Sequence, residues 1–321
     1  MQFSLPKLFS KRTCIPIVLC FDAAYANWAA VTIYSAFTNS KTTLKFYCLV
    51  PKSEQGKLGA IEHLRNKFKI EIEIIYFDID LFQNWSVVGH FSPVVYSKFL
   101  IPELVKEKKV IYLDSDILVL NDLSELYQTE LNGYAIAGVL DTYGEKYSAV
   151  PRDTNDSYIN TGVLLLDLNL LRRDNFIEKC TKIYHEFSDI LKMVDQCVIN
   201  KYAENKKVIL DKKWNTQVVS NTTSINEWNE HKEQSSIIHF IFNIKPWMSW
   251  CNPLIFRFYW SYANKIEFPN LNPIAIIYVH EAVTLANVLD FLKDFETSSK
   301  IKTQLINILI SKVHQKNNNQ T

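Results

Sequence analysis

The sequence predicts an α/β protein built on a mostly parallel β-sheet with helices flanking it. Two observations predict this class. Short apolar, β-branched runs alternate with longer helical patterns between residue 14 and about residue 250, and acidic residues gather where apolar runs end. The chain has 321 residues, 48% of them hydrophobic, which is enough for one large domain with or without an appendage. The net charge is only +1, so the chain has no excess of positive charge that would indicate binding to nucleic acid.

The first third of the chain alternates predicted strands with predicted helices. Each strand is short and apolar, and the first is typical of a strand buried on both faces. The predicted strands are residues 15–21, 44–50, 70–77 and 109–113. The predicted helices are residues 26–37, 53–68 and 92–105. Ser53 is a candidate N-cap of the second helix, and Pro102 should interrupt the third.

The alternation of predicted strands and helices ends near residue 265. The segment "PNLNP" interrupts the pattern, and two amphipathic segments follow at residues 281–295 and 298–316. We therefore expect a catalytic domain over residues 1–265 and a helical C-terminal segment over residues 266–321. That segment has an apolar face and several lysines, which would suit either anionic lipid or a partner helix.

Cysteine use and hydropathy favour a cytoplasmic protein. The six cysteines form no C-x-x-C pair, so reduced and mostly buried thiols are expected. The N-terminal residues are too weakly apolar for a signal peptide, and the run "CIPIVLCF" is too short to span a bilayer. The cysteines are Cys14, Cys20, Cys48, Cys180, Cys197 and Cys251.

Two aspartates interrupt an apolar stretch in "KKVIYLDSDILVL", residues 108–120. An Asp-x-Asp tripeptide alone is a weak signal, since it also occurs in solvated acidic turns. Asp114 and Asp116 follow an apolar strand, however, and a parallel sheet binds its ligands beyond the carboxyl ends of its strands. A divalent cation chelated by both carboxylates would remove their mutual repulsion.

A second polar element lies in "IIHFIFNIKPW", residues 237–247. His239 is either a hydrogen-bonded core histidine or a metal ligand, and with two carboxylates it would favour manganese over magnesium. Lys245 is either a solvated lysine or a point charge that binds phosphate.

The order of these motifs resembles glycosyltransferase family 8, a family of retaining sugar transferases with the GT-A fold that includes bacterial lipopolysaccharide galactosyl- and glucosyltransferases. The resemblance covers residues 15–247. It rests on an ordered set of segments, each weak by itself. They are "IVLCFDAAYA" (17–26), "YLDSDILV" (112–119), "YINTGVLLLDL" (158–168), "DQCVIN" (195–200), "KWNTQ" (213–217) and "HFIFNIKPW" (239–247).

The resemblance implies a hexosyltransferase that uses a UDP-sugar, UDP-galactose or UDP-glucose, with Mn²⁺ as the metal and Mg²⁺ as a possible substitute. The acceptor it implies is an oligosaccharide or a lipid-linked saccharide at the inner face of a bacterial cytoplasmic membrane. It also implies that Asp114, Asp116 and His239 bind the metal. Asp22 would accept the uracil N–H, and Tyr25 would stack on the base.

Five further residues match positions around the donor sugar and diphosphate. By resemblance, Asn160 hydrogen-bonds the sugar, Asp141 lies near it, and Lys245 contacts the diphosphate. Asp195 and Gln196 match the pair at the reactive face of the sugar. Asp195 could attack C1 in a double displacement, as in retaining glycosidases. In the alternative front-face route, which we favour, the acceptor hydroxyl attacks on the side that the diphosphate leaves.

Three residues depart from the family pattern. Lys98 stands where the family often has an arginine beside the donor, so the charge is kept without bidentate geometry. Ala24 replaces a polar residue that contacts uracil. Phe242 occupies the place of a glycine after the histidine, which puts a backbone contact to phosphate in doubt.

Three alternatives remain open at this stage. The chain could be a self-glucosylating or soluble-acceptor member of the family, or a catalytically silent scaffold that binds nucleotide sugars. The retention of every charged motif residue disfavours the scaffold. The aromatic segment at residues 247–265 is either a membrane-interface belt or an ordinary core helix.

Overall fold

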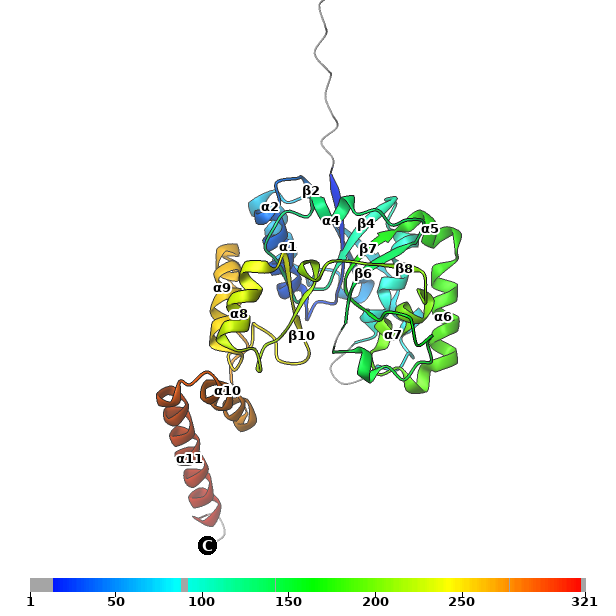
Figure 1. Cartoon of the computed structure of the whole chain (residues 1–321). Helices are drawn as coiled ribbons and strands as arrows, with labels where there is room; N and C mark the ends of the chain where they lie inside the picture. The colour runs from blue at the N-terminus through cyan, green and yellow to red at the C-terminus, as the bar shows by residue number, and fades with distance from the viewer. Residues whose placement is uncertain (1–13, 88–91, 142, 277, 319–321) are drawn as a thin grey trace, which may run out of the picture. The chain divides into compact units, whose positions relative to one another are not determined.

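The computed structural model describes residues 14–87, 92–141, 143–276 and 278–318 (Figure 1). The chain forms two compact units. The first runs through Thr216 and includes Ser235–His239. The second contains Gln217–Gln234 and the residues from Phe240 onward.

The core of the first unit is a seven-stranded sheet in the order β3-β2-β1-β4-β7-β6-β8. Four strand pairs are parallel and two, β4–β7 and β6–β7, are antiparallel, so the predicted mostly parallel α/β fold is confirmed. The strands are β1 (Ile15–Cys20), β2 (Leu44–Pro51), β3 (Ile72–Phe77), β4 (Lys109–Leu113), β6 (Ile136–Leu140), β7 (Ile159–Asp167) and β8 (Lys207–Ile209).

A row of neighbouring side chains crosses the middle of this sheet. Val18 pairs with Tyr47 on one side and with Tyr112 on the other, and Tyr112 pairs with Leu164. All four are buried in one apolar cluster that also includes residues of α5 (Leu168–Arg173), α6 (Phe176–Phe187) and α7 (Val194–Tyr202). Consecutive residues of β1, from Ile17 to Leu19, are 0% exposed, so this central strand is covered on both faces, which explains its near-continuous apolar run.

Helices of the first unit pack on and around the sheet (Figure 1). α1 packs against α2 and the short strand β5 (Ile117–Val119), while α7 packs against β7 and α6. The helices of this unit are α1 (Ala26–Asn39), α2 (Gly59–Phe68), α3 (Ile101–Leu104), α4 (Ser124–Gln128), α5 (Leu168–Arg173), α6 (Phe176–Phe187) and α7 (Val194–Tyr202).

Two details of the predicted helices are wrong. The second helix begins at Gly59 instead of residue 53, because Ser53 lies in a separate 3₁₀ turn, Lys52–Glu54, and Gly56 follows with a φ of +81°. The predicted helix over residues 92–105 is mostly 3₁₀, from Pro93 to Leu100, before α3 begins. Pro102 lies in the first turn of α3, where proline is tolerated because no backbone donor is needed there.

A second, three-stranded sheet has the order β5-β10-β9. Its strands are β5 (Ile117–Val119), β9 (Thr216–Val219) and β10 (Ile237–Ile241). β5 and β10 are antiparallel, and their register sets His239 opposite Ile117. This pairing brings the histidine beside the Asp-x-Asp segment, which lies more than 120 residues earlier in the chain, a contact that no local pattern could reveal.

The second unit contains the helices α8 (Ile225–Gln234), α9 (Pro253–Ile266), α10 (Val279–Phe291) and α11 (Phe295–Asn318). α8 packs against α9, and α10 packs against α11, where the buried Ser298 hydroxyl donates to the Ala286 carbonyl over 3.0 Å. The end of α9 coincides with the predicted boundary near residue 266. That residues 266–321 form a separate segment stays a prediction.

The aromatic segment at residues 247–265 forms much of the core of the second unit. Trp247, Tyr259 and Trp260 are at most 6% exposed. Trp247 and Phe240 each contact the ring of Tyr259. The core-helix interpretation therefore accounts for these rings. None of the described helices is long and apolar enough to cross a membrane, and the six cysteines, all in the described part of the chain, are free thiols.

Candidate active site

Acidic and amide side chains converge at one edge of the central sheet. Asp22 follows β1, and Asp114 follows β4, at the carboxyl ends of parallel strands. β6 runs in the same direction as β4 because both pair antiparallel with β7, so Asp141 leaves the sheet at this edge. Asn160 lies there too, since β7 starts where β4 ends. The predicted clustering at strand ends thus has a topological cause.

Asp114, Asp116 and His239 form the one group of potential metal ligands in the described residues. Their ligand atoms all lie within 4.8 Å of one another. His239 Nε2 is 3.2 Å from Asp116 Oδ1 and 3.9 Å from Asp114 Oδ2. Carboxylate oxygens with an imidazole nitrogen are a donor set that suits a divalent cation such as manganese. The residues present therefore fit a metal, and we call them the metal triad.

The two oxygens of Asp114 have different surroundings. Oδ1 accepts a hydrogen bond from the Tyr112 hydroxyl at 2.5 Å and lies 3.2 Å from Lys98 Nζ. Oδ2 is the oxygen that faces His239. One oxygen is thus anchored, and the other is directed at the position between the triad residues.

Gly162 makes room for the imidazole of the metal triad. A Cβ at this position would lie 2.2 Å from His239 Cε1, 2.7 Å from His239 Nδ1 and 3.0 Å from Asp114 Oδ2. The Gly162 carbonyl accepts the Asp114 amide over 2.8 Å, which fixes the backbone that the imidazole approaches. Any side chain here would displace a triad residue, so this position requires glycine for close approach.

A second buried cluster joins Asp141, Asn160 and Gln196. Asp141 Oδ2 accepts from Gln196 Nε2 at 2.8 Å and from Asn160 Nδ2 at 3.2 Å. Asp141 Oδ1 accepts the backbone amides of Tyr143 and Gly144. All three side chains are at most 6% exposed. We call this group the amide–carboxylate cluster, and it contains three of the four residues that the resemblance assigned to the donor sugar.

Gly144 makes room for the amide–carboxylate cluster, as Gly162 does for the metal triad. A Cβ on Gly144 would lie 2.5 Å from Asp141 Oδ2 and 2.7 Å from Gln196 Nε2. Sequence reasoning missed both glycines. The available signal was scarcity: the chain has only 7 glycines in 321 residues, and one of them lies within the quoted segment "YINTG".

Lys98 links the metal triad to Asp195. Its Nζ donates to Asp195 Oδ2 at 2.8 Å and lies over the Tyr112 ring. Burial by itself would lower the pKa of Lys98, but the charges of Asp114 and Asp195 outweigh it and raise the pKa. The lysine therefore keeps its charge while only 6% exposed.

Asp195 is held on two sides at the start of α7. Besides Lys98, the Thr161 hydroxyl donates to Asp195 Oδ2 over 3.2 Å. Burial raises the pKa of the Asp195 carboxyl, and the Lys98 ammonium opposes that shift. The preceding Val194 has a φ of +38°, a conformation that β-branched residues rarely adopt and that stores roughly 1–3 kcal/mol of strain.

Asp22 and Tyr25 form the turn between β1 and α1. Asp22 Oδ1 accepts the Tyr25 amide at 3.2 Å, and Oδ2 accepts the Ser92 hydroxyl at 3.1 Å. Burial, and then the charges of Asp116, Asp22 and Asp114, raise the pKa of the Tyr25 hydroxyl. Two carboxylates of the metal triad, Asp116 and Asp114, are thus among the charges that act on the Tyr25 hydroxyl.

Lys245 lies in the second unit. It is 4% exposed, and its Nζ donates to the Phe240 carbonyl over 2.7 Å. Phe242, between them, has a φ of +65°, in the left-handed region that favours glycine. The backbone here thus adopts a left-handed conformation although the residue is not a glycine. The role of Lys245 toward a diphosphate stays a prediction.

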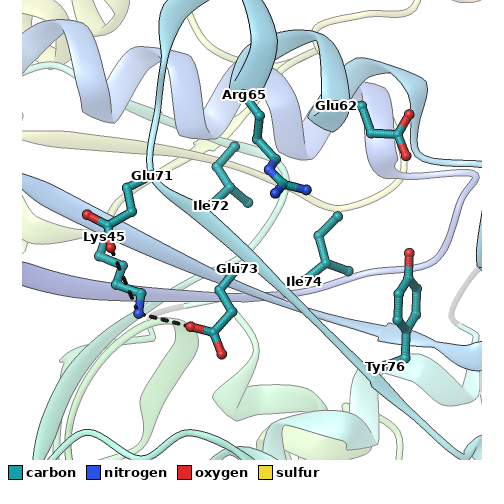
Figure 2. Close-up of a pocket in the computed structure, with 8 residues that line it drawn as sticks. All are labelled: Lys45, Glu62, Arg65, Glu71, Ile72, Glu73, Ile74 and Tyr76. Carbon is teal, nitrogen blue, oxygen red and sulfur yellow. Dashed lines mark ion pairs between the residues drawn. The ribbon is translucent and has the colours of Figure 1, made fainter.

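A surface pocket of about 470 Å³ lies apart from these residues (Figure 2). Its lining comes from β2, β3 and α2, and Lys45 pairs there with Glu71 and Glu73. β3 is the edge strand, separated from β4 by two strands. No predicted site residue lines this pocket, and we assign it no function.

Comparison with known proteins decides the family. The model of glycosyl transferase family 8 matches residues 16–251. The chain belongs to this family. As a member of family 8 it is a glycosyltransferase, as the motif order predicted. It is 27% identical over 255 residues to general stress protein A of Bacillus subtilis, a match that covers 74% of this chain and 89% of the relative.

Other relatives of this family 8 chain include enzymes named for their reactions. Lipopolysaccharide 1,2-glucosyltransferase of Escherichia coli is 26% identical over 249 residues, with 74% of each chain covered. The matched region is only 61% of the length of glycosyltransferase GlyF of Streptococcus pneumoniae. The crystal structure of galactosyltransferase LgtC with donor and acceptor sugar analogs superposes with a TM-score of 0.68 at 18% identity, covering 84% of this chain and all of LgtC. This similarity confirms the GT-A-type fold.

Proposed function

We propose that this glycosyltransferase is a metal-dependent, retaining hexosyltransferase. It would move galactose or glucose from a UDP-sugar to an oligosaccharide or lipid-linked saccharide in cell-surface glycan synthesis. The observation that carries the proposal is the metal triad, two carboxylates and an imidazole within 4.8 Å at the ligand-binding edge of the sheet. The names of the E. coli and LgtC relatives support the hexose donor and the saccharide acceptor.

Asp114, Asp116 and His239 would hold Mn²⁺, or Mg²⁺ less well. A bound divalent cation supplies electrostatic stabilisation of the charge that grows on a leaving diphosphate. Lys98 holds Oδ1 of Asp114, so Oδ2 stays directed toward His239. Lys245 would add a point charge for the diphosphate, and Asp22 and Tyr25 would bind the uracil.

The amide–carboxylate cluster would bind the donor sugar. Asp141 is fully engaged by Gln196, Asn160 and two backbone amides, which makes the cluster rigid before any ligand arrives. A hexose presents several hydroxyl groups, and preorganised acceptors and amides recognise such groups with little loss of entropy. These three residues therefore orient the sugar in the proposal.

The surroundings of Asp195 favour the front-face route. A nucleophilic carboxylate needs an accessible oxygen, but Oδ2 of Asp195 is bound by Lys98 and Thr161 and the residue is 4% exposed. In the proposed route, the acceptor oxygen bonds to C1 as the C1–O bond to the diphosphate breaks. The leaving phosphate oxygen takes the acceptor's proton. Gln196 and Asp195 then position the sugar without covalent attachment.

We further propose that the protein acts in the cytoplasm, peripherally bound at the inner face of the membrane through α10 and α11. Phe291, the last residue of α10, and Phe295, the first residue of α11, are 51% and 63% exposed. Sedimentation with anionic vesicles tests this: removal of residues 298–321 should reduce binding while leaving UDP-sugar hydrolysis intact.

The central test is UDP release from UDP-galactose and from UDP-glucose, each with Mn²⁺, with Mg²⁺ and with a chelator. We expect Mn²⁺-dependent release from one of the two donors. Asp116→Ala should reduce this release at least about 100-fold, because loss of a ligand disrupts metal binding. The exposed Asp189→Ala is the matched control and should behave as wild type. Normal release by Asp116→Ala would overturn the metal assignment.

A further inference from the structure

Asn215 connects the metal triad to the amide–carboxylate cluster. Its Oδ1 lies 3.0 Å from His239 Nδ1, and its Nδ2 donates to Asn160 Oδ1 at 2.8 Å. The side chain is 1% exposed. Nothing in the sequence assigned it a role, although it lies in the quoted segment "KWNTQ".

The orientation of the Asn160 amide follows from its other partners. The Gly162 backbone N–H, which can only donate, bonds to Asn160 Oδ1 at 2.9 Å. The Asp141 carboxylate accepts from Asn160 Nδ2. Asn160 Oδ1 is therefore an oxygen, and the group of Asn215 that faces it must be the NH₂ donor.

This orientation determines the protonation pattern of His239. With the NH₂ group of Asn215 on Asn160, the carbonyl oxygen of Asn215 faces His239 Nδ1. An oxygen only accepts, so Nδ1 must carry the hydrogen. In the neutral imidazole, Nε2 then bears the lone pair, and Nε2 is the atom directed at Asp116 and Asp114.

The backbone holds Asn215 in this position. It follows the short 3₁₀ helix Lys212–Trp214, and its amide donates to the Lys212 carbonyl. Trp214 is 4% exposed, and the Ser236 amide bonds to the Lys213 carbonyl, which ties this segment to the start of β10. Asn215 and His239 are thus fixed to each other at both backbone and side chain.

We propose that Asn215 is a positioning residue that fixes the Nδ1–H tautomer of His239 and couples the metal triad to the amide–carboxylate cluster. The proposal rests on the proposed role of His239 as a metal ligand. A metal-binding imidazole donates its second nitrogen to a fixed acceptor, which orients the ring and tunes affinity. Here that acceptor is an amide whose other end touches the residues assigned to the sugar, so a single residue aligns both groups.

Two variants separate the two links of Asn215. Asn215→Asp keeps an acceptor for Nδ1–H but loses the donor to Asn160, whereas Asn215→Ala loses both. We expect Mn²⁺ affinity to stay within about threefold in Asn215→Asp and to fall about 10- to 100-fold in Asn215→Ala. Both variants should lower kcat, because each removes the hydrogen bond from Asn215 to Asn160 Oδ1.

The tautomer is tested without metal by ¹⁵N NMR of histidine-labelled protein at mildly alkaline pH, with His239→Gln to assign the signals. We expect a pyrrole-type Nδ1 and a pyridine-type Nε2 in wild type and in Asn215→Asp, and a shifted mixture in Asn215→Ala. Asn252→Ala, which removes another fully buried asparagine, is the matched control and should leave these signals and Mn²⁺ affinity unchanged.

The outcomes are distinguishable. A wild-type Nε2–H tautomer, or unchanged signals and Mn²⁺ affinity in Asn215→Ala, would overturn the inference about Asn215. Absence of Mn²⁺ binding by the wild type would instead overturn the proposed metal-dependent function.

Discussion

At the residue scale, glycines determine which side chains can approach one another. Gly162 lies so close to the His239 imidazole that a methyl group would overlap it, with 2.2 Å to Cε1. Backbone hydrogen bonding to Asp114 leaves this segment little freedom to move away. The metal triad can therefore form only if residue 162 carries no Cβ atom.

Gly162→Ala should reduce Mn²⁺ affinity about 10- to 100-fold, because the imidazole must leave its position between the carboxylates. Gly133→Ala is the matched control. Gly133 has open space around it but a φ of +84°, so alanine there should cost about 1 kcal/mol of stability without affecting the metal. Mn²⁺ titration and urea denaturation separate the two effects, and equal Mn²⁺ affinity in both variants would refute the role of Gly162.

Phe242 is a second residue-scale feature, because a bulky residue at a φ of +65° is strained. Phe242→Gly and Phe242→Ala both remove the ring and differ mainly in backbone freedom. We expect the glycine variant to be the more stable by about 1 kcal/mol, the reverse of the usual order in regular structure. Thermal denaturation of the pair measures this, and a more stable alanine variant would argue against the left-handed conformation.

At the element scale, Lys98 joins three elements: the 3₁₀ helix Pro93–Leu100, the end of β4 and the start of α7. Two carboxylates that would repel each other are held by one buried ammonium. This arrangement is compatible with a lysine at the position where the resemblance led us to expect an arginine. A point charge between two carboxylates needs no bidentate fork.

Lys98→Met should lower the free energy of unfolding by about 3 kcal/mol, because it leaves the buried Asp195 and the partly buried Asp114 without their cation. Lys57→Met is the matched control. Lys57 pairs with Glu54 on the surface and is 58% exposed, so its loss should change stability by less than about 0.5 kcal/mol. Urea denaturation gives both values, and a small effect at Lys98 would show that the carboxylates relax to other partners.

At the scale of the whole molecule, buried ion pairs make stability depend on pH. Asp156 lies beside Lys207 and Arg152, which hold strand β8 to the segment before β7. Burial alone would raise the pKa of Asp156, but hydrogen bonds from Lys207 and Asn205 outweigh it and lower the pKa.

A lowered folded-state pKa stabilises the protein above the unfolded-state pKa of about 4, and this stabilisation is lost as the pH falls through the folded-state pKa. We expect the free energy of unfolding to fall as the pH drops below about 4. Asp156→Asn should weaken that dependence. Urea denaturation over this pH range is the measurement, and an unchanged slope in Asp156→Asn would assign the effect to other carboxylates.

Much of the fold was predictable because short stretches of sequence determine where its strands and helices lie. The apolar runs gave β1, β2 and β4 to within one residue of their observed bounds, since strands covered on both faces leave little room for polar residues. The start of α2 was missed because the Lys52–Glu54 turn uses residues equally suited to a helix. The 3₁₀ geometry of Pro93–Leu100 was missed because it follows from packing rather than from periodicity.

The sequence by itself determined the family, the α/β class and the identity of the charged residues, because each motif keeps its chemistry within a few neighbouring positions. Only the tertiary structure decided which of these residues meet. β10 pairs with β5 and brings His239 to Asp116, antiparallel β7 brings Asn160 to the edge where Asp114 and Asp141 emerge, and Asn215 bridges the two groups. Contacts between residues 19 to 123 positions apart arise from sheet topology, which no local pattern encodes.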